Sequence, residues 1–384
     1  MDGEVHKIVG CIKSLETNRC VGCGACANVC SNKCIYMKAD EGGFLYPYID
    51  ISLCDGCGNC VTCCPVLNPQ VIPERQKEPQ VYAAWSLDES IRKQSSSGGI
   101  FTELSKAVLK RGGYIAGAKY NAEHLVEHAL IDKVKDLHLL RQSKYIQSET
   151  KDIYKSVETL LKKNKLVLFV GTPCQCAAMN TYLQQNYGNL ILCDFICHGV
   201  NSPSVYKKYL KELEDVFGAP IKSVAFRDKT NGWINYNVRI IFKNGKNYIS
   251  NYEDDPFMYG FVRKNLNLYQ RPSCGECMFK GVKRQTDITL GDFWGIEPKD
   301  KPEYFNGVSA IMLHTACGDK LFKELSRTIY FEERSIQEVV SKNIHIIESA
   351  KHSTESFQFW EDFKTKSFKD IMLCLRNIKK NTEK

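Results

Sequence analysis

The feature that most constrains this chain is a pair of cysteine runs near its N-terminus. Both runs read C-x-x-C-x-x-C-x-x-x-C, the first from Cys20 to Cys30 and the second from Cys54 to Cys64. In paired runs of this kind, three cysteines of a run hold one [4Fe–4S] cluster and the fourth ligates the other cluster. The runs therefore predict a small two-cluster domain over residues 1–68, with one-electron transfer as its role.

The crossed pattern divides the eight cysteines into two ligand sets. The first set is Cys20, Cys23, Cys26 and Cys64, and the second set is Cys54, Cys57, Cys60 and Cys30. Glycines between the cysteines tolerate the backbone angles that a tight cluster loop needs. Pro65 follows the last cysteine as the pattern requires, whereas Ser31 replaces proline after the first run. Cys63 remains an alternative to Cys64 as the ligand.

Other uses of cysteine fit the two runs less well. Structural zinc sites usually take their four ligands as two separated pairs, and disulfide frameworks belong to small secreted domains. The 384-residue chain has 19 cysteines and opens MDGEVHKIVG, which lacks the apolar segment of a secretory signal. We therefore expect a cytoplasmic protein that uses cysteine for metal. Four further cysteines are expected to be buried as small hydrophobic residues: Cys11, Cys34, Cys317 and Cys374.

Hydropathy and charge argue against two classes of partner. No apolar stretch reaches the ~18 residues that a membrane span needs. The formal net charge is +8, but a [4Fe–4S] core with four thiolates carries about −2, so three clusters would cancel about six of these charges. The lysines are also dispersed along the chain, and we expect no nucleic-acid partner.

After the cysteine runs, the sequence pattern changes twice. Residues 69–80 contain three prolines and are typical of a linker. From residue 81 strands and helices alternate, which predicts an α/β domain over 81–345, with halves of about 81–165 and 166–345. Residues 346–384 are expected to form a C-terminal helical tail. Expected strands are 81–86, 114–119, 166–171, 189–196, 221–228, 235–242, 246–251, 287–293 and 308–314. Residues 43–48 should form a hairpin, 149–163 and 202–216 helices, and the part after 314 should be helical, including 356–376.

Four cysteines of the large domain stand where ligands gather in an α/β sheet. Cys174 and Cys197 each follow a predicted strand, and the carboxyl ends of parallel strands meet at one edge of a sheet. The loop that carries Cys274 and Cys277 could meet them there and complete one four-thiolate site. From spacing alone, zinc and an iron–sulfur cluster fit such a site equally well. Two more cysteines are weaker candidates: Cys176 and Cys193.

Six segments of the large domain carry a further signal. They are SSSGGIFTEL (95–104), GTPCQCAAM (171–179), CHGVNSPSVY (197–206), FRDKTNGW (226–233), CGECMFK (274–280) and TDITLGDFWGI (286–296). In this order they resemble the coenzyme F-420 hydrogenase/dehydrogenase beta-subunit family over about residues 80–330. The resemblance implies a bound FAD with a [4Fe–4S] cluster near it, and it favours iron–sulfur at the third site. The expected fold class is then α+β/α/β: a small dicluster ferredoxin domain fused to a larger mixed α/β flavin-binding domain.

The resemblance directs attention to residues that could hold the flavin. The loop Ser96-Ser97-Gly98-Gly99 precedes a helix, where hydroxyls, N–H groups and the helix dipole suit a pyrophosphate or form an ordinary helix cap. Three basic residues are candidates to neutralise flavin or substrate charge: Arg227, Lys229 and Arg284. Asp287 and Asp292 should face opposite sides of one strand, and Asp292 lies nearer the carboxyl end, where ligands gather.

The predicted catalytic residues are His198 and Lys229. His198 follows a predicted cluster ligand, where it would donate a proton or support the cluster from outside. Electrons would pass from ferredoxin or another redox protein through the clusters to FAD, which would reduce a small-molecule substrate near Ser97, His198 and Lys229. The same path could also run in the reverse direction. The alternative is an electron-transfer subunit of a larger complex, without a substrate site of its own.

Overall fold

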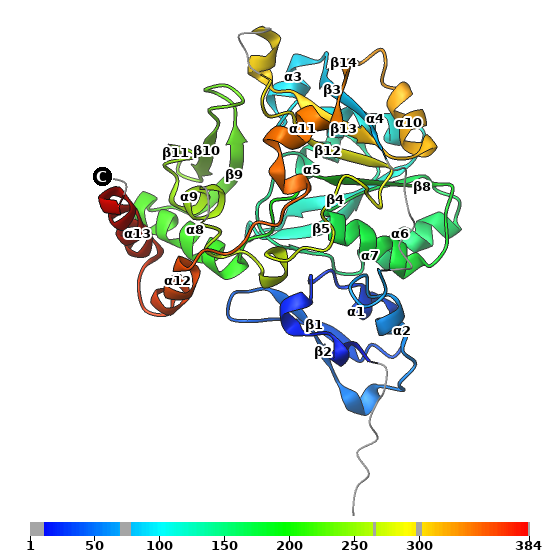
Figure 1. Ribbon diagram of the computed structural model, residues 1–384, viewed down its shortest axis with the longest axis horizontal. Coiled ribbons are helices and arrows are strands. Elements are labelled where there is room, and N and C mark those ends of the chain that lie inside the picture. Colours follow the sequence, from blue (N-terminus) through cyan, green and yellow to red (C-terminus); the bar gives the residue numbers. More distant parts are fainter. Residues whose placement is uncertain (1–10, 70–77, 264–265, 297–301, 383–384) are drawn as a thin grey trace, which may run out of the picture.

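The structure, a computed structural model, describes residues 11–69, 78–263, 266–296 and 302–382. The described strands form three sheets, of two, three and nine strands. Figure 1 shows a small N-terminal unit at the bottom, a lobe with the three-stranded sheet at the left, and the large sheet with its helices at the right. The first ten residues of the expected ferredoxin domain and residues 70–77 of the expected linker lie outside the described residues.

The N-terminal unit, residues 11–69, contains an antiparallel hairpin and two short helices. In the hairpin, β1 (Ile35–Ala39) pairs with β2 (Leu45–Ile49), and the Gly43 amide donates to the Asp40 carbonyl at 2.9 Å in the turn. The hairpin therefore spans residues 35–49, and the expected range 43–48 covers only the end of its turn and most of its second strand. The helices of the unit are α1 (Ala25–Val29) and α2 (Asn59–Thr62), with η1 (Ile12–Ser14), η2 (Thr17–Arg19) and η3 (Ile51–Leu53) as 3-10 turns.

The large sheet has the strand order β14-β3-β13-β12-β8-β7-β4-β5-β6. Its centre is parallel from β12 to β4, while β13, β3 and β14 add antiparallel neighbours on one side and β5 on the other. The strands are β3 (Gln80–Ser86), β4 (Tyr114–Tyr120), β5 (Val126–Ile131), β6 (Ser148–Glu149), β7 (Val167–Val170), β8 (Leu190–Phe195), β12 (Ile288–Asp292), β13 (Ser309–Leu313) and β14 (Ile329–Arg334).

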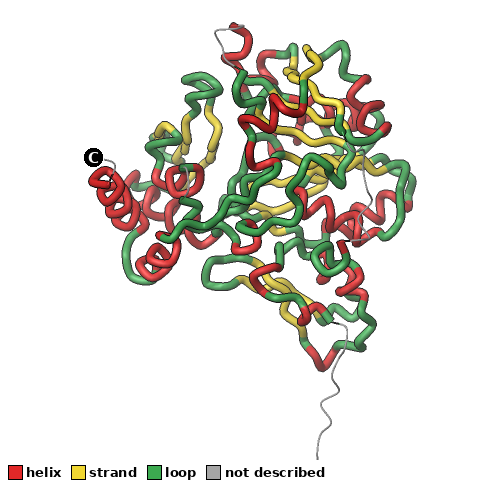
Figure 2. The backbone as a smooth tube through the Cα atoms, in the orientation of Figure 1, coloured by secondary structure: helices red, strands yellow, loops and turns green. Residues whose placement is uncertain are grey.

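Helices cover both faces of this sheet, as the red and yellow segments of Figure 2 show. Val167 and Phe169 of β7 pack toward α6 and α7, whereas Leu168 faces α4 on the opposite side. The core on the α6–α7 face continues into the N-terminal unit, so the two parts share buried side chains. The helices are α3 (Glu89–Lys93), α4 (Ile100–Lys110), α5 (Leu137–Leu140), α6 (Ile153–Lys162), α7 (Pro173–Leu183), α10 (Ala316–Lys323) and α11 (Ile336–Lys342), with η5 (Val134–Asp136), η6 (Pro272–Cys274), η7 (Pro302–Asn306) and η8 (Ile344–Ile346).

The third sheet and the C-terminal helices form a lobe with its own core. An antiparallel sheet of β9 (Ile221–Asp228), β10 (Asn237–Phe242) and β11 (Asn247–Asn251) packs with α8 (Pro203–Phe217), α9 (Pro256–Val262), α12 (Glu355–Phe363) and α13 (Phe368–Thr382). The Glu212 carboxylate of α8 accepts hydrogen bonds from the Phe368 and Lys369 amides at the start of α13. The predicted tail is thus helical, but it packs against the lobe.

Three expectations about secondary structure are wrong. The part after residue 314 is not all helical, because β14 pairs with β3. The expected helix 356–376 is two helices, since the chain turns at 364–367 and Ser367 then caps α13 through the Asp370 amide. Helix α6 begins at Ile153 rather than at 149, because Ser148 and Glu149 pair with β5. Strand β5 itself was not expected from the sequence pattern.

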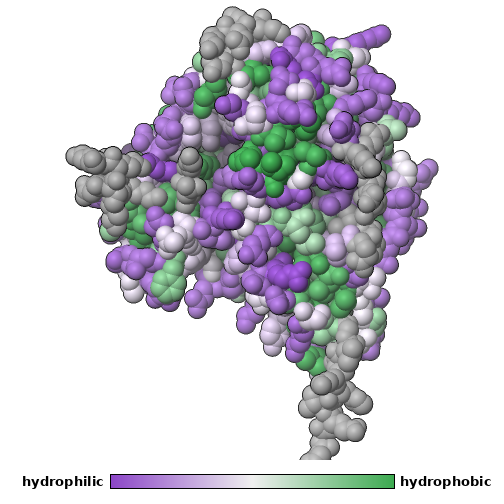
Figure 3. Space-filling model, in the orientation of Figure 1, coloured by the Kyte–Doolittle hydropathy of each residue, from purple (hydrophilic) through white to green (hydrophobic). Residues whose placement is uncertain are grey.

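The surface is mainly polar on the face drawn in Figure 3, with hydrophobic residues gathered near the position of α11 in Figure 1. Ile344 and Ile347, which follow α11 in the chain, are among the exposed large hydrophobic residues. No helix among the described residues is both long and apolar enough to cross a membrane.

Candidate iron–sulfur centres and cofactor site

The first cavity of the N-terminal unit is lined by the first predicted ligand set. Cys20, Cys23 and Cys26 come from one loop, and Cys64 comes from the end of the second run. The other lining side chains are mostly apolar: Ile12, Leu15, Val21, Ala25, Met37, Pro47 and Val66. Cys63 does not line this cavity, because its buried thiol points at the Cys60 carbonyl 3.6 Å away. The geometry therefore favours Cys64 over Cys63 as the fourth ligand.

The second cavity is lined by the second predicted set, Cys30, Cys54, Cys57 and Cys60. Cys57 is exposed, so this cavity lies nearer to solvent than the first one. Cys11 and Cys34, which we expected to be ordinary core residues, line it as well. Of the other two expected core thiols, Cys317 is only partly buried and Cys374 is exposed.

The loops that carry these cysteines have the backbone that a tight cluster loop requires. Gly22, Gly24, Gly56 and Gly58 all have φ between 66° and 76°. This left-handed region is strained for residues with a Cβ. In the first loop glycine is also needed for space, because a Cβ on Gly22 would overlap the side chains of Gln147 and Arg271.

The thiols fit iron–sulfur clusters chemically. Burial and the neighbouring Cys64 raise the pKa of Cys23 well above its ordinary value. Thiolates packed so closely need a positive partner, which the iron of a cluster supplies. No three His, Cys, Asp or Glu side chains in the described part of the chain are placed to hold a single metal ion.

The third set of cysteines meets at the carboxyl edge of the parallel strands. Cys174 lies at the start of α7 after β7, and Cys197 follows β8. Cys274 ends η6, and Cys277 lies in the loop that follows. Burial, followed by the nearby Cys197, raises the pKa of Cys274 to about 12, and the Cys277 thiol acts in the same direction. The four thiols therefore lie within interaction range of one another, as the sequence predicted. Cys176 and Cys193 are fully buried in the core.

Basic side chains surround this third set. The Lys280 ammonium donates to the Cys197 carbonyl at 2.5 Å and to the His345 carbonyl at 2.7 Å. Arg284 is 2% exposed, and its charge also acts on Cys197. The Nε and one Nη of Arg284 are buried without a hydrogen-bond partner. This arrangement suits an anionic centre, as a thiolate-bound cluster would be.

Arg271 joins the first set to the main domain, and the sequence analysis missed it. Its buried guanidinium donates to the Cys20 carbonyl at 2.8 Å, to the Leu45 carbonyl at 3.0 Å and to Gln147 Oε1 at 3.0 Å. Gln147 in turn donates to the Gly22 carbonyl at 3.3 Å. The guanidinium also acts on the Cys274 thiol of the third set. One buried cation therefore lies between the first and third thiol sets.

Tyr154 of α6 is a second residue between these sets that the sequence analysis missed. Its side chain is fully buried, and its hydroxyl has no hydrogen-bond partner. Burial raises the pKa of Tyr154 well above its ordinary value, and Cys23 and then Cys174 are the next largest causes. The hydroxyl thus lies near ligands of two different sets.

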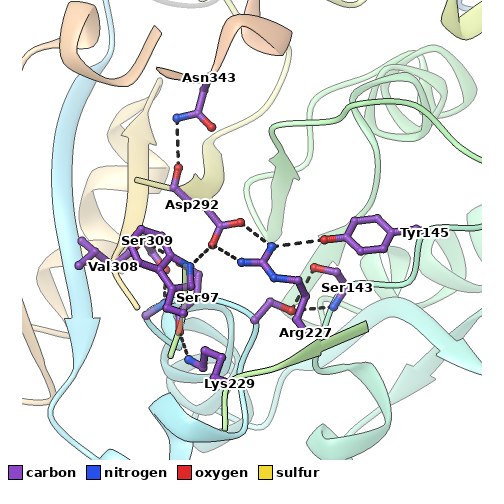
Figure 4. A network of polar contacts seen from close by, with 12 residues as sticks. Ser97, Ser143, Tyr145, Arg227, Lys229, Asp292, Val308, Ser309 and Asn343 are labelled. Atoms are coloured by element: carbon purple, nitrogen blue, oxygen red, sulfur yellow. Dashed lines mark hydrogen bonds and ion pairs between the residues drawn. The ribbon is translucent and has the colours of Figure 1, made fainter. Parts of the chain in front are cut away.

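Several residues predicted for the flavin are engaged with one another or with neighbouring protein groups (Figure 4), whereas Arg284 lies beside the third thiol set. Arg227 is buried and forms two hydrogen bonds with the Asp292 carboxylate, at 2.8 and 3.1 Å. Trp233 donates to the same carboxylate at 2.7 Å. The Lys229 ammonium donates to three carbonyls, one of them that of Ser97 at 2.8 Å, and burial lowers the pKa of Lys229 to about 7. Asp287 lies apart and accepts from the Leu192 amide.

The serine–glycine loop before α4 is engaged in the same way. Ser96 Oγ accepts from the Ser143 amide at 2.8 Å, and Ser97 Oγ donates to the Val308 carbonyl at 2.7 Å. The Gly98 amide donates to Ser309 Oγ at 3.0 Å, and Gly99 caps the helix with a φ of 91°. The loop therefore behaves as a packed helix start, and its described side chains do not form an open pyrophosphate cradle.

His198 belongs to the surroundings of the third thiol set. Its Nε2 is 2.9 Å from Asn267 Oδ1, and its ring packs against His345 at 3.9 Å between centroids. Burial and the neighbouring His345 lower the pKa of His198 to about 4, so the ring is neutral at pH 7. The described contacts of Lys229 are with Arg92, Ser97 and Asn306 instead. The structure thus places the two predicted catalytic residues in separate networks.

Comparison with known families agrees with this architecture. Residues 19–68 match the 4Fe-4S dicluster domain, and residues 81–155 and 164–339 match the N-terminal and C-terminal models of coenzyme F420 hydrogenase/dehydrogenase, beta subunit. The chain belongs to this family. The resemblance inferred from the six segments is confirmed, and so is a mixed α/β fold with an N-terminal ferredoxin-like domain.

Relatives of this beta-subunit-like chain include part of a dehydrogenase and a ferredoxin-type protein. An F(420)H(2) dehydrogenase subunit of Methanosarcina mazei is 22% identical over 322 residues, which cover 80% of this chain and 82% of that protein. The ferredoxin-type protein NapF of Haemophilus influenzae is 36% identical over 61 residues, which cover 16% of this chain and 34% of that protein. A chain from a solved structure of the F420-reducing [NiFe] hydrogenase complex of Methanosarcina barkeri aligns with a TM-score of 0.47 at 17% identity, covering 71% of this chain and 86% of that chain.

Proposed function

We propose that this chain is an iron–sulfur oxidoreductase subunit that passes electrons between a redox protein, such as ferredoxin, and a small-molecule substrate. The observation that carries the proposal is the order of the three thiol sets. The second set includes the exposed Cys57, the first set is joined to the main domain through Arg271, and the third set lies within that domain. Three clusters in this order would lead electrons from the surface to the interior.

In this proposal, the protein holds the third cluster with four cysteines and tunes it with nearby charges. The ligands would be Cys174, Cys197, Cys274 and Cys277. Lys280 and Arg284 would stabilise the more negative, reduced state of the cluster and so raise its reduction potential. Tyr154 and Arg271 would connect it to the first cluster.

The same proposal includes FAD as the two-electron group and coenzyme F420 as the first substrate to test. A flavin couples one-electron carriers to hydride transfer, and it supplies that chemistry wherever it is bound. The support for FAD is the family resemblance alone, because most of the predicted flavin residues already contact other protein groups. The protein residues that we assign to the reaction are therefore limited to the cluster ligands and the groups that position them.

The experiment that tests the proposal is the iron, sulfide and flavin content of protein purified and reconstituted without oxygen. We expect about twelve irons per chain, from three clusters, and one FAD. Cys174→Ala should lose about four irons. Cys193→Ala, in the next strand, is the matched control and should lose none. About eight irons in the wild-type chain would show that the third set does not hold a cluster, and absent flavin would remove FAD from the proposal.

A second candidate is an electron-transfer subunit without its own substrate site. The separation of His198 from Lys229 favours it, because the two predicted catalytic groups share no described contact. If this candidate is right, the chain should co-purify with a larger redox partner. Reduction of coenzyme F420 by the isolated, dithionite-reduced chain would count against it.

A further inference from the structure

The second cavity holds more thiols than a cluster needs. Four predicted ligands line it, and Cys11 and Cys34 line it too. Cys34 is 3% exposed and Cys11 is 8% exposed, so both are shielded from solvent, as is the expected ligand Cys60. A [4Fe–4S] cluster takes four thiolates, which leaves two thiols in the cavity without an assigned role.

Cys34 lies directly beside one predicted ligand. Its Sγ is 3.3 Å from the Sγ of Cys30, and the Cys54 thiol is also within hydrogen-bonding range of it. The backbone on both sides is fixed: the Lys33 amide donates to the Cys30 carbonyl at 3.2 Å, and the Asp50 amide donates to the Cys34 carbonyl at 2.8 Å. Two thiols are therefore presented to the same corner of the cavity.

This position is different from that of an ordinary core cysteine. Cys193 packs among the aliphatic side chains of the large sheet, whereas Cys34 makes its closest described sulfur contact with a predicted ligand. Cys30 is also the ligand whose run departs from the usual pattern, since Ser31 follows it instead of proline. A short loop therefore separates two thiols that could each bind the same iron.

We propose that Cys34 is a reserve ligand for the corner of the second cluster that Cys30 binds. While Cys30 binds the iron, the Cys34 thiol donates an S–H hydrogen bond to the Cys30 thiolate. When Cys30 is replaced, or when its Fe–S bond breaks and it leaves as a thiolate, the Cys34 S–H bond breaks and the Cys34 sulfur forms the new Fe–S bond. The iron keeps its oxidation state, and the Cys34 proton passes to solvent. The inference rests on the second cluster of the dicluster domain, and it is independent of FAD and of the third cluster.

The test is iron content of anaerobically reconstituted full-length variants. Alanine is used because a serine oxygen could itself bind iron. We expect Cys57→Ala, which removes an exposed ligand, and the double variant Cys30→Ala/Cys34→Ala to lose about four irons per chain. Cys30→Ala alone and Cys30→Ala/Cys11→Ala should lose none. Equal iron loss in Cys30→Ala and in the double variant with Cys34→Ala would overturn the proposal.

If the Cys30→Ala variant does not fold, it should lose the first cluster as well as the second. A second measurement, on a variant that keeps Cys30, covers that case. Cys34→Ala keeps all predicted ligands, so the second cluster should form with full iron. Its reduction potential should fall, because a donor to a ligand sulfur is removed and such donors favour the reduced state. An unchanged potential of the second cluster, measured by a redox titration with electron paramagnetic resonance, would overturn the proposal. Wild-type protein that lacks the second cluster would instead contradict the proposed function.

Discussion

The replacement Arg271→Met should weaken the attachment of the ferredoxin-like unit to the main domain. Arg271 is 1% exposed and makes two hydrogen bonds between the two parts, to the Cys20 and Leu45 carbonyls, and a third to Gln147 within the main domain. Methionine keeps an unbranched apolar stem, but it leaves the Cys20 and Leu45 carbonyls without this donor. A buried polar group left unpaired costs about 1–3 kcal/mol, so we expect the free energy of opening this interface to fall by about 2–6 kcal/mol.

Opening of the interface can be measured as release of iron to a chelator. Even the lower end of that range raises the open population about 30-fold, because each 1.4 kcal/mol is a factor of ten. We expect the initial rate of iron release, at a urea concentration that leaves the wild type folded, to rise in proportion. Arg111→Met is the matched control, since Arg111 forms an exposed ion pair with Glu324 whose loss should matter little.

Two outcomes would separate the causes or refute the reasoning. Iron release from Arg271→Met within twofold of that from Arg111→Met would refute it, because the buried hydrogen bonds would then contribute little. Arg271→Lys keeps the positive charge but loses the fork of donors. Full recovery in Arg271→Lys would show that charge beside the clusters, and not the hydrogen bonds, holds the interface closed.

Three further predictions concern the cluster ligands, the gap between clusters and the dependence on pH. Cys64→Ala should lose about four irons, whereas Cys63→Ala should keep them, as iron analysis will show. Tyr154→Phe removes a single hydroxyl, which has no hydrogen-bond partner and lies near the first and third thiol sets. Its loss should lower the reduction potential of the first or third cluster in a redox titration, and unchanged potentials would contradict this. Burial lowers the pKa of His128 to about 4 in the folded protein, whereas the histidine of the unfolded chain has a pKa of about 6.5. Between these two pH values the unfolded state binds more protons, so the free energy of unfolding should fall by ~3 kcal/mol as the pH drops from about 6.5 to about 4. His128→Gln should flatten that dependence in thermal unfolding, and an equal slope in both proteins would refute it.

The cysteine sets could be predicted because their geometry is local or follows from general topology. Within a run, the spacing alone brings three thiols to one loop, and the left-handed glycines such as Gly22 confirm the predicted backbone. The third set joins three distant segments. It was still predictable, because the carboxyl ends of neighbouring parallel strands meet at one edge, which places Cys174 beside Cys197.

The residues around the clusters could not be predicted in this way. Arg271 and Gln147 lie more than a hundred residues from the loop they contact, and no periodic pattern marks them. The position of Arg271 just before Pro272, Ser273 and Cys274 was the one available signal. For the flavin residues, the sequence showed suitable chemical groups but not their partners. Arg227 and Asp292 were both singled out, yet nothing in the pattern indicated that they would pair with each other.

In the proposed function, the attachment of the ferredoxin-like unit would limit how electrons enter the main domain. Arg271 and Gln147 bind the loop of the first thiol set, and the Thr150 hydroxyl donates to the Cys23 carbonyl at 2.7 Å. These bonds fix the first set against the main domain, and of the two sets in this unit the second is nearer to solvent, with exposed Cys57. We therefore expect a redox partner to approach the second set.

A charge placed beside the second set should therefore slow electron entry from a redox protein. Leu53 is 55% exposed and directly precedes Cys54, whereas Leu87 is 59% exposed and follows β3 of the main domain. Leu53→Glu should slow reduction of the clusters by reduced ferredoxin, because a partner docked there would have to desolvate the new carboxylate. Leu87→Glu is the matched control and should leave the rate unchanged. Equal rates in the two variants, at equal iron content, would place the docking site away from the second set.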